Sequence, residues 1–96
     1  MKPLYLIAEI HPNHDKLARL SEEFKTLIEK TRAEEGCLLY DLVEEEGFDG
    51  WLMIEKWESR EHWEKHIESD HVKNINSLDE LFTTPTNLRF MTEVTA

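Results

Sequence analysis

The segment EHWEKHIESDH, from Glu61 to His71, holds three of the five histidines of the chain. An imidazole titrates near neutral pH, so it can take a proton from a substrate and later return it. Imidazole nitrogens are also common zinc ligands. The segment therefore offers three alternatives: a pair of proton carriers, a metal site, or polar and buried histidines without a chemical role.

Helical periodicity separates these histidines. Trp63, His66 and Ile67 fall on one side of a helix, and the two apolar residues direct that side toward a sheet. His66 is therefore predicted to point inward. His62 lies one turn earlier, at the edge of this face. His71 follows a break in the helix, where the chain can turn back toward the same space.

The metal alternative rests on His62 and His66, whose i, i+4 spacing is the one that zinc-binding helices use. A third ligand would have to be His71, Glu55 or His11. The residue after His62 is a tryptophan, so the HExxH motif of metalloproteases is absent. Two histidines at this spacing often occur by chance, and we predict no metal site.

The elements that position these residues follow from apolar periodicity and turn residues. The first part of the chain predicts a strand over Leu4–Ile10, a long helix with an apolar stripe from Leu17 to Ile28, and two strands over Cys37–Glu45 and Trp51–Glu58 joined by the turn GFDG. The second part predicts a helix from Ser59 to about Glu68, a short helix ending at Ile75, a helical turn over Leu78–Phe82 and a strand over Leu88–Val94.

This order, β-α-β-β-α-β, predicts an α+β ferredoxin-like fold: an antiparallel four-stranded sheet with helices on one face. The 96 residues are expected to form a single domain over 1–96. The first three strands are apolar on both faces at their centres, whereas helices can cover only one face. We therefore expect a homodimer whose sheets pack face to face, because soluble monomers rarely expose a large apolar patch.

The formal net charge of -10 and the pI near 4.8 argue against binding nucleic acid or an anionic membrane surface. No apolar run is long enough for a transmembrane helix, and the first residues do not resemble a secretory signal. Cys37 is the only cysteine, so no internal disulfide framework is possible. A cytoplasmic location is the expectation.

The string MIEKWESREHWEKHIESDH, preceded by EEGCLLY, resembles the antibiotic-biosynthesis-monooxygenase superfamily, in particular its small quinol-monooxygenase-like and autoinducer-processing members. The shared pattern is a strand that ends E-x-W-x-S, followed by a helix that ends H-x-x-x-x-H. The matching positions are Glu55, Trp57, Ser59, His66 and His71, with Gly36, Cys37 and Tyr40 upstream. The resemblance covers essentially the whole chain and implies a dimeric α+β barrel.

The resemblance also implies a cofactor-independent monooxygenase, which oxidises a small hydroquinone-like or polyketide-like substrate with dioxygen and needs no metal or flavin. His66 is the candidate base and His71 a second proton carrier. The candidate substrate-binding residues are Tyr40, Glu55, Trp57 and Trp63, three of which could stack on a planar substrate. Glu55, if it points inward, could orient an imidazole.

The haem-degrading branch of the superfamily is disfavoured, because Ile10, His66 and Asn76 depart from the residues expected at those places. Two alternatives to the oxygenase remain. One is an isomerase or lyase that acts through an enediol on a small carbonyl compound. The other is a non-catalytic dimeric binding module. Oxygen dependence separates the oxygenase from the isomerase, and the loss of any activity dependence on His66 would favour the binding module.

Overall fold

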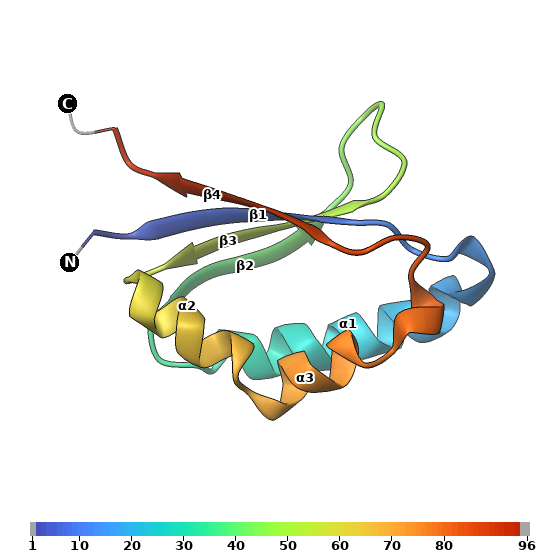
Figure 1. Ribbon diagram of the computed structural model, residues 1–96, viewed down its shortest axis with the longest axis horizontal. Coiled ribbons are helices and arrows are strands. Elements are labelled where there is room, and N and C mark those ends of the chain that lie inside the picture. Colours follow the sequence, from blue (N-terminus) through green and yellow to red (C-terminus); the bar gives the residue numbers. More distant parts are fainter. Residues whose placement is uncertain (1, 95–96) are drawn as a thin grey trace.

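The computed structural model describes residues 2–94, in which a four-stranded antiparallel sheet lies over one layer of helices (Figure 1). The strands are β1 (Leu4–Ile10), β2 (Cys37–Val43), β3 (Trp51–Trp57) and β4 (Asn87–Thr92). The helices are α1 (Leu17–Arg32), α2 (Arg60–Ile67) and α3 (Asp70–Asn76), with single turns of 3-10 helix at η1 (His14–Lys16) and η2 (Asp79–Leu81). The sheet order β2-β3-β1-β4 confirms the predicted ferredoxin-like fold.

Strand β1 runs through the middle of the sheet and sets which side chains face the helices. Its residues alternate strictly between buried and half-buried along its whole length, as the period of two in its sequence predicts. Leu6 lies opposite Glu55 of β3 on one side and opposite Phe90 of β4 on the other. These three side chains therefore share the helix-facing side of the sheet.

Serine caps define the two short helices that carry the histidines. The side chain of Ser59 accepts a hydrogen bond from the backbone N–H of His62 at the start of α2. Ser69 does the same for Val72 at the start of α3, so the predicted break between the helices is confirmed. Strand β2 ends at Val43, slightly earlier than predicted, because the acidic residues after Val43 are exposed and have no partner strand. Strand β3 also ends one residue earlier than predicted.

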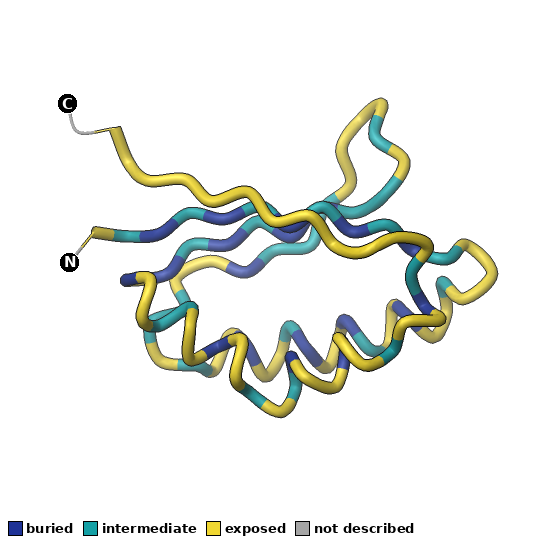
Figure 2. The backbone as a smooth tube through the Cα atoms, in the orientation of Figure 1, coloured by how far each residue is buried: buried dark blue, intermediate teal, exposed yellow. Residues whose placement is uncertain are grey.

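The helices cover β4 only in part, through the contacts of Arg60 and Trp63 of α2 with the ring of Phe90. Strand β4 is exposed along its whole length (Figure 2). Leu88 is 42% exposed and Phe90 is 41% exposed, although both share the helix-facing side of the sheet with the buried Leu6.

Ile67 of α2 is also exposed, despite its place beside His66 on the inward side of the helix. The helix layer therefore leaves open space beneath part of the sheet. Among residues 2–94, no helix is both long and apolar enough to cross a membrane.

Gly36 makes the close turn that joins α1 to β2. Its φ of +85° lies in the left-handed region, where residues with a Cβ are disfavoured. A Cβ at this position would also overlap the imidazole of His62 on α2. The glycine therefore allows the start of β2 to lie directly against α2. Gly47 has nearly the same φ of +83°, but a Cβ there would meet no atom within 4 Å.

Replacing Gly36 with alanine is expected to destabilise the protein more than the matched replacement Gly47→Ala. Both variants carry the backbone cost of a left-handed alanine, about 1–2 kcal/mol. Only Gly36→Ala must also displace His62, which adds a further overpacking cost of about 1–3 kcal/mol. Urea unfolding of the two variants measures the difference. Equal losses would mean that the Gly36 turn does not hold His62 in place.

Candidate functional site

A cavity of about 620 Å³ lies between the sheet and the helices. Its aromatic walls are Phe24, Tyr40, Trp63 and Phe82, and its titratable groups are Glu55, His66 and Asp79. The segment between η2 and β4 and the uncovered residue Leu88 close the remaining side. This volume is in the range of small-molecule sites in proteins, and the mainly apolar wall with few polar groups is typical of them.

Within residues 2–94, His66 is one of the two buried polar residues that line this cavity, and Glu55 is the other. Its ring lies against Trp57, with 4.6 Å between ring centroids, and edge-on to Tyr40 at 5.4 Å. Burial, and to a smaller extent the charge of the neighbouring His71, together lower the pKa of His66 from 6.5 to about 4. The imidazole is therefore neutral at neutral pH and can accept a proton.

Glu34 holds the ring of His66. The Oε2 atom of Glu34 lies 2.6 Å from Nδ1 of His66. Glu34 occupies the turn after α1, where its N–H donates to the carbonyl of Thr31 and its own carbonyl accepts from Cys37. The Glu34 side chain keeps 19% exposure, and a carboxylate oxygen accepts where an imidazole N–H donates, so we assign the shared proton to Nδ1. The lone pair of the ring is then on Nε2.

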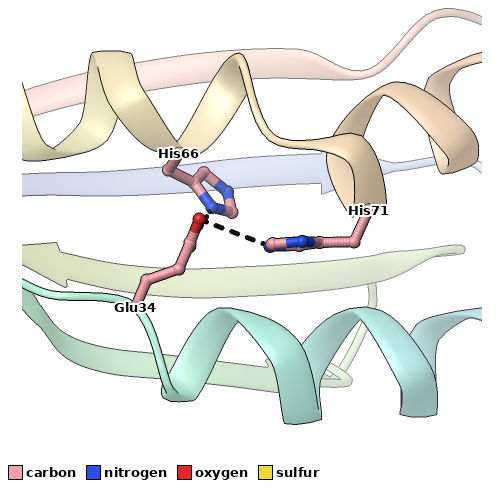
Figure 3. Close-up of side chains that lie close together, drawn as sticks. All are labelled: Glu34, His66 and His71. Atoms are coloured by element: carbon pink, nitrogen blue, oxygen red, sulfur yellow. Dashed lines mark hydrogen bonds and ion pairs between the residues drawn. The ribbon is translucent and has the colours of Figure 1, made fainter.

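The other carboxylate oxygen of Glu34 faces His71. Oε1 lies 3.3 Å from Nε2 of His71, but the angles do not make a hydrogen bond and leave this buried nitrogen without a partner. Figure 3 shows the carboxylate between the two imidazoles, which come from α2 and from the start of α3. Burial raises the pKa of Glu34, and the nearby His71 partly offsets this.

These three residues include the ligand types of a zinc site, and their nearest nitrogen and oxygen atoms lie within 4.8 Å of one another. However, ligand atoms about 2.1 Å from a tetrahedral zinc ion are separated by about 3.4 Å. The 2.6 Å contact between Glu34 and His66 is much shorter than this. The geometry fits a shared proton better than a metal ion between the two side chains.

Glu55 is the second buried titratable group in the cavity. Nε1 of Trp57 donates a hydrogen bond of 3.0 Å to Oε1 of Glu55. Burial raises the pKa of Glu55 to about 7; the bond from Trp57 opposes this rise, and the charge of Glu34 adds to it. Glu55 points inward, as its place in β3 predicts, but the residue that orients the imidazole is Glu34.

The structure brings four of the six predicted site residues to the cavity. Tyr40, Glu55, Trp63 and His66 all line it. Trp57 is fully buried behind His66 and is not part of the wall.

His71 is the other predicted site residue that does not line this cavity. It lines a smaller depression between α1 and α3 instead, and Glu34 connects it to His66.

His62 lies apart from this cluster. Its Nδ1 is 2.7 Å from Oγ of Ser59, and its Nε2 is 3.7 Å from Glu58 and 3.9 Å from Glu35. The i, i+4 pair of histidines therefore does not form a site. Sequence reasoning missed Glu34, although the string EEGCLLY begins at this residue. The acidic pair before Gly36 was the one available signal.

The fold and the cavity define a ferredoxin-like α+β domain with a cavity of small-molecule size between its sheet and its helices. Residues 3–77 match the family described as Antibiotic biosynthesis monooxygenase, and the chain belongs to this family. The relative named "Putative monooxygenase Rv0793" of Mycobacterium tuberculosis is 33% identical over 84 residues, which are 86% of this chain and 83% of that protein.

The solved structure of Rv0793 superimposes with a TM-score of 0.89 at 29% identity, and the match covers 98% of this chain and 97% of that one. The relative named "Putative monooxygenase YcnE" of Bacillus subtilis is 32% identical over 73 residues, 75% of this chain and 77% of that protein. Family membership and these names support a monooxygenase-like role for the chain.

The two buried titratable groups are expected to give opposite pH dependences of the free energy of unfolding. The pKa of Glu55 is raised from 4.5 to about 7, so its contribution falls as pH rises through this window. The pKa of His66 is lowered from 6.5 to about 4, so its contribution falls as pH drops from 6.5 to 4. Each full change amounts to about 3 kcal/mol.

Single variants separate the two contributions. Relative to the wild-type protein, Glu55→Gln should gain stability as pH rises from 4.5 to 7. His66→Gln should instead gain stability relative to wild type as pH falls from 6.5 to 4. Urea unfolding between pH 4 and 8 measures both differences. A difference that stays constant with pH would show that the replaced group is not perturbed by burial.

Proposed function

We propose that this chain is a monooxygenase that oxidises a small hydroquinone-like or polyketide-like molecule with dioxygen, with His66 as the base and without a bound metal or flavin. The observation that carries the proposal is the orientation of His66. Glu34 holds Nδ1, which leaves Nε2 as the proton acceptor of a ring that lines the cavity. A carboxylate at this distance also stabilises the imidazolium that forms when the proton arrives.

The proposed reaction begins with a hydroxyl group of an anthrone-type substrate in its enolic form. Nε2 of His66 takes the hydroxyl proton, and the resulting anion gives one electron to dioxygen. The radical and superoxide then combine to form a carbon–oxygen bond. After protonation, the hydroperoxide loses water and leaves a carbonyl group. The protein contributes orientation, exclusion of water and a held proton acceptor.

The cavity wall supports an uncharged aromatic substrate. Tyr40 and Trp63 provide faces on which a planar ring can stack. Among residues 2–94, no lysine or arginine lines the cavity, whereas Glu55 and Asp79 do. An anionic substrate would therefore meet no cation there. This disfavours the alternative of an isomerase for phosphorylated enediols, but not an isomerase for neutral carbonyl compounds.

Oxygen uptake by the chelator-treated protein tests the proposal. A panel of hydroquinones and hydroxylated anthrones serves as substrates, and autoxidation without protein is the background. His66→Ala should lower the protein-dependent rate by about 10²–10⁴-fold, the usual contribution of a positioned base. The matched control is His14→Ala, since His14 is exposed and does not line the cavity. Chelator treatment should leave the wild-type rate unchanged.

Other outcomes would redirect the assignment. A rate that is unaffected by His66→Ala would remove His66 as the base. Loss of the rate on chelation would contradict metal-free chemistry. Binding of the panel compounds without oxygen uptake would favour the isomerase or the non-catalytic module.

We also propose that the chain forms a homodimer through the face of the sheet that carries no helices (Figure 1). The register places Ile7 beside Ile54 and Tyr5 beside Met91 on this face. Met91 is 39% exposed. An identical sheet related by a two-fold axis would cover these apolar residues.

Sedimentation velocity tests the dimer. Ile54→Lys places a charge at the centre of the proposed interface and should shift the protein from dimer to monomer. Ala18→Lys is the matched control, because Ala18 is an exposed residue of α1 in the helix layer. A wild-type protein that sediments as a monomer, or an Ile54→Lys variant that stays dimeric, would contradict this interface.

A further inference from the structure

We propose that Glu34 and His71 form a proton relay that connects His66 in the cavity to solvent in the depression between α1 and α3. This inference rests on the proposed function, because it assigns a path to the proton that His66 takes from the substrate. Its geometry does not depend on which substrate is used. The relay makes His71 a proton-carrying residue outside the substrate cavity.

The inner end of the relay is defined by the contacts of His66. Its Nδ1 is bound to Glu34, and its Nε2 makes no hydrogen bond to the protein. Within residues 2–94, the buried side-chain nitrogen and oxygen atoms that lack a partner are Oγ1 of Thr31 and Nε2 of His71. Nε2 of His66 is not one of them, so it is accessible from the cavity that His66 lines.

The outer end is His71, whose two ring nitrogens have different surroundings. Nε2 is buried and faces Oε1 of Glu34 at 3.3 Å. Nδ1 makes no hydrogen bond within residues 2–94. A fully buried nitrogen without a partner would stand beside Nε2 in the set of unpartnered buried atoms, and Nδ1 does not, so it is accessible to water. His71 lines a depression of about 220 Å³ whose walls come from α1 and α3, among them Lys30, Asp70 and Asn74.

Glu34 bridges the two rings with different oxygens. Oε2 contacts Nδ1 of His66 at 2.6 Å, and Oε1 faces Nε2 of His71 at 3.3 Å (Figure 3). The ring centroids of the two histidines are 6.1 Å apart, too far for a direct proton transfer. A half-turn of a protonated carboxyl group exchanges its oxygens and presents the proton to His71.

The outward transfer has three steps. When Nε2 of His66 takes the substrate proton, Nδ1 passes its own proton to Glu34. Glu34 passes it to Nε2 of His71, and Nδ1 of His71 releases a proton to water. Every group is then in its starting charge state, but both imidazoles have changed tautomer and now hold their proton on Nε2.

The inward transfer restores His66. The peroxide formed in the cavity takes the proton from Nε2, while the relay returns one proton from water to Nδ1. One proton has then left and one has entered, as the overall conversion of a ring carbon and dioxygen to a carbonyl and water requires. The substrate mouth does not have to admit water for either transfer.

The charged and titratable groups around the relay come from several elements. The ring of Tyr40 on β2 packs edge-on against His66. Besides burial, the charge of Glu34 raises the pKa of Cys37 on β2 and of Glu55 on β3. Burial raises the pKa of Tyr40 well above its usual value and that of Cys37 to about 11, so both remain protonated near neutral pH.

The test measures how fast the Nδ1 proton of His66 exchanges with water, by NMR of protein labelled with 15N in its histidines. No substrate is needed, so the result is independent of the oxygen-uptake experiment. His71→Phe keeps a ring in place but cannot carry a proton, and it should slow the exchange by at least about tenfold. His71→Gln is a second variant with the same expectation. His14→Gln should leave the rate unchanged.

Each outcome decides the proposal. Slower exchange supports the relay, because a variant that merely loosens the packing would speed exchange up. An unchanged or faster rate would mean that the proton leaves Glu34 directly to water, which overturns the relay. A wild-type spectrum in which His66 carries its proton on Nε2, or in which no Nδ1 proton is held, overturns it as well.

Discussion

The contact between Glu34 and His66 is the interaction on which the site depends. A buried imidazole without a partner costs free energy, and this one has its partner in the turn after α1, 32 residues away in the chain. The contact therefore links the turn after α1 to α2 on the helix-covered side of the sheet. It fixes which nitrogen of His66 is available to the cavity. The Gly36 turn contributes to this arrangement, because it lets the start of β2 approach α2.

The same contact lets a titratable side chain be packed tightly in the core, although burial of such a group usually destabilises a protein. Trp57 and Tyr40 pack against the ring of His66 and keep it in one orientation, while their apolar surroundings keep it neutral. Glu55 shows the complementary effect, since burial favours its protonated form. The acidic side chain of Glu55 and the basic side chain of His66 thus both favour their uncharged forms in the wall of one cavity.

The fold was predictable because its signals are local. The alternation in β1, the serine before α2 and the serine before α3 each act within a few residues, and all three are where the sequence indicates. The inward direction of His66 also follows from periodicity. Glu34 was not predictable, because it lies in a turn that has no periodicity and its partner is distant in the chain. The direction of His71 depends on how the chain bends after Ile67, which no local pattern specifies.

The incomplete cover of β4 has a consequence for how the specificity of the site can change. The family match spans residues 3–77, which include Glu34, Glu55, His66 and His71. The wall that closes the open side of the cavity, from Asp79 through Thr83–Thr86 to Leu88, lies beyond that span. Insertions or substitutions in this wall can reshape the cavity without changing Glu34, Glu55, His66 or His71. Part of the cavity wall therefore lies in a different stretch of sequence from Glu34, His66 and His71, although Tyr40 and Trp63 share the matched span with them. That part of the wall can vary independently of the three titratable residues.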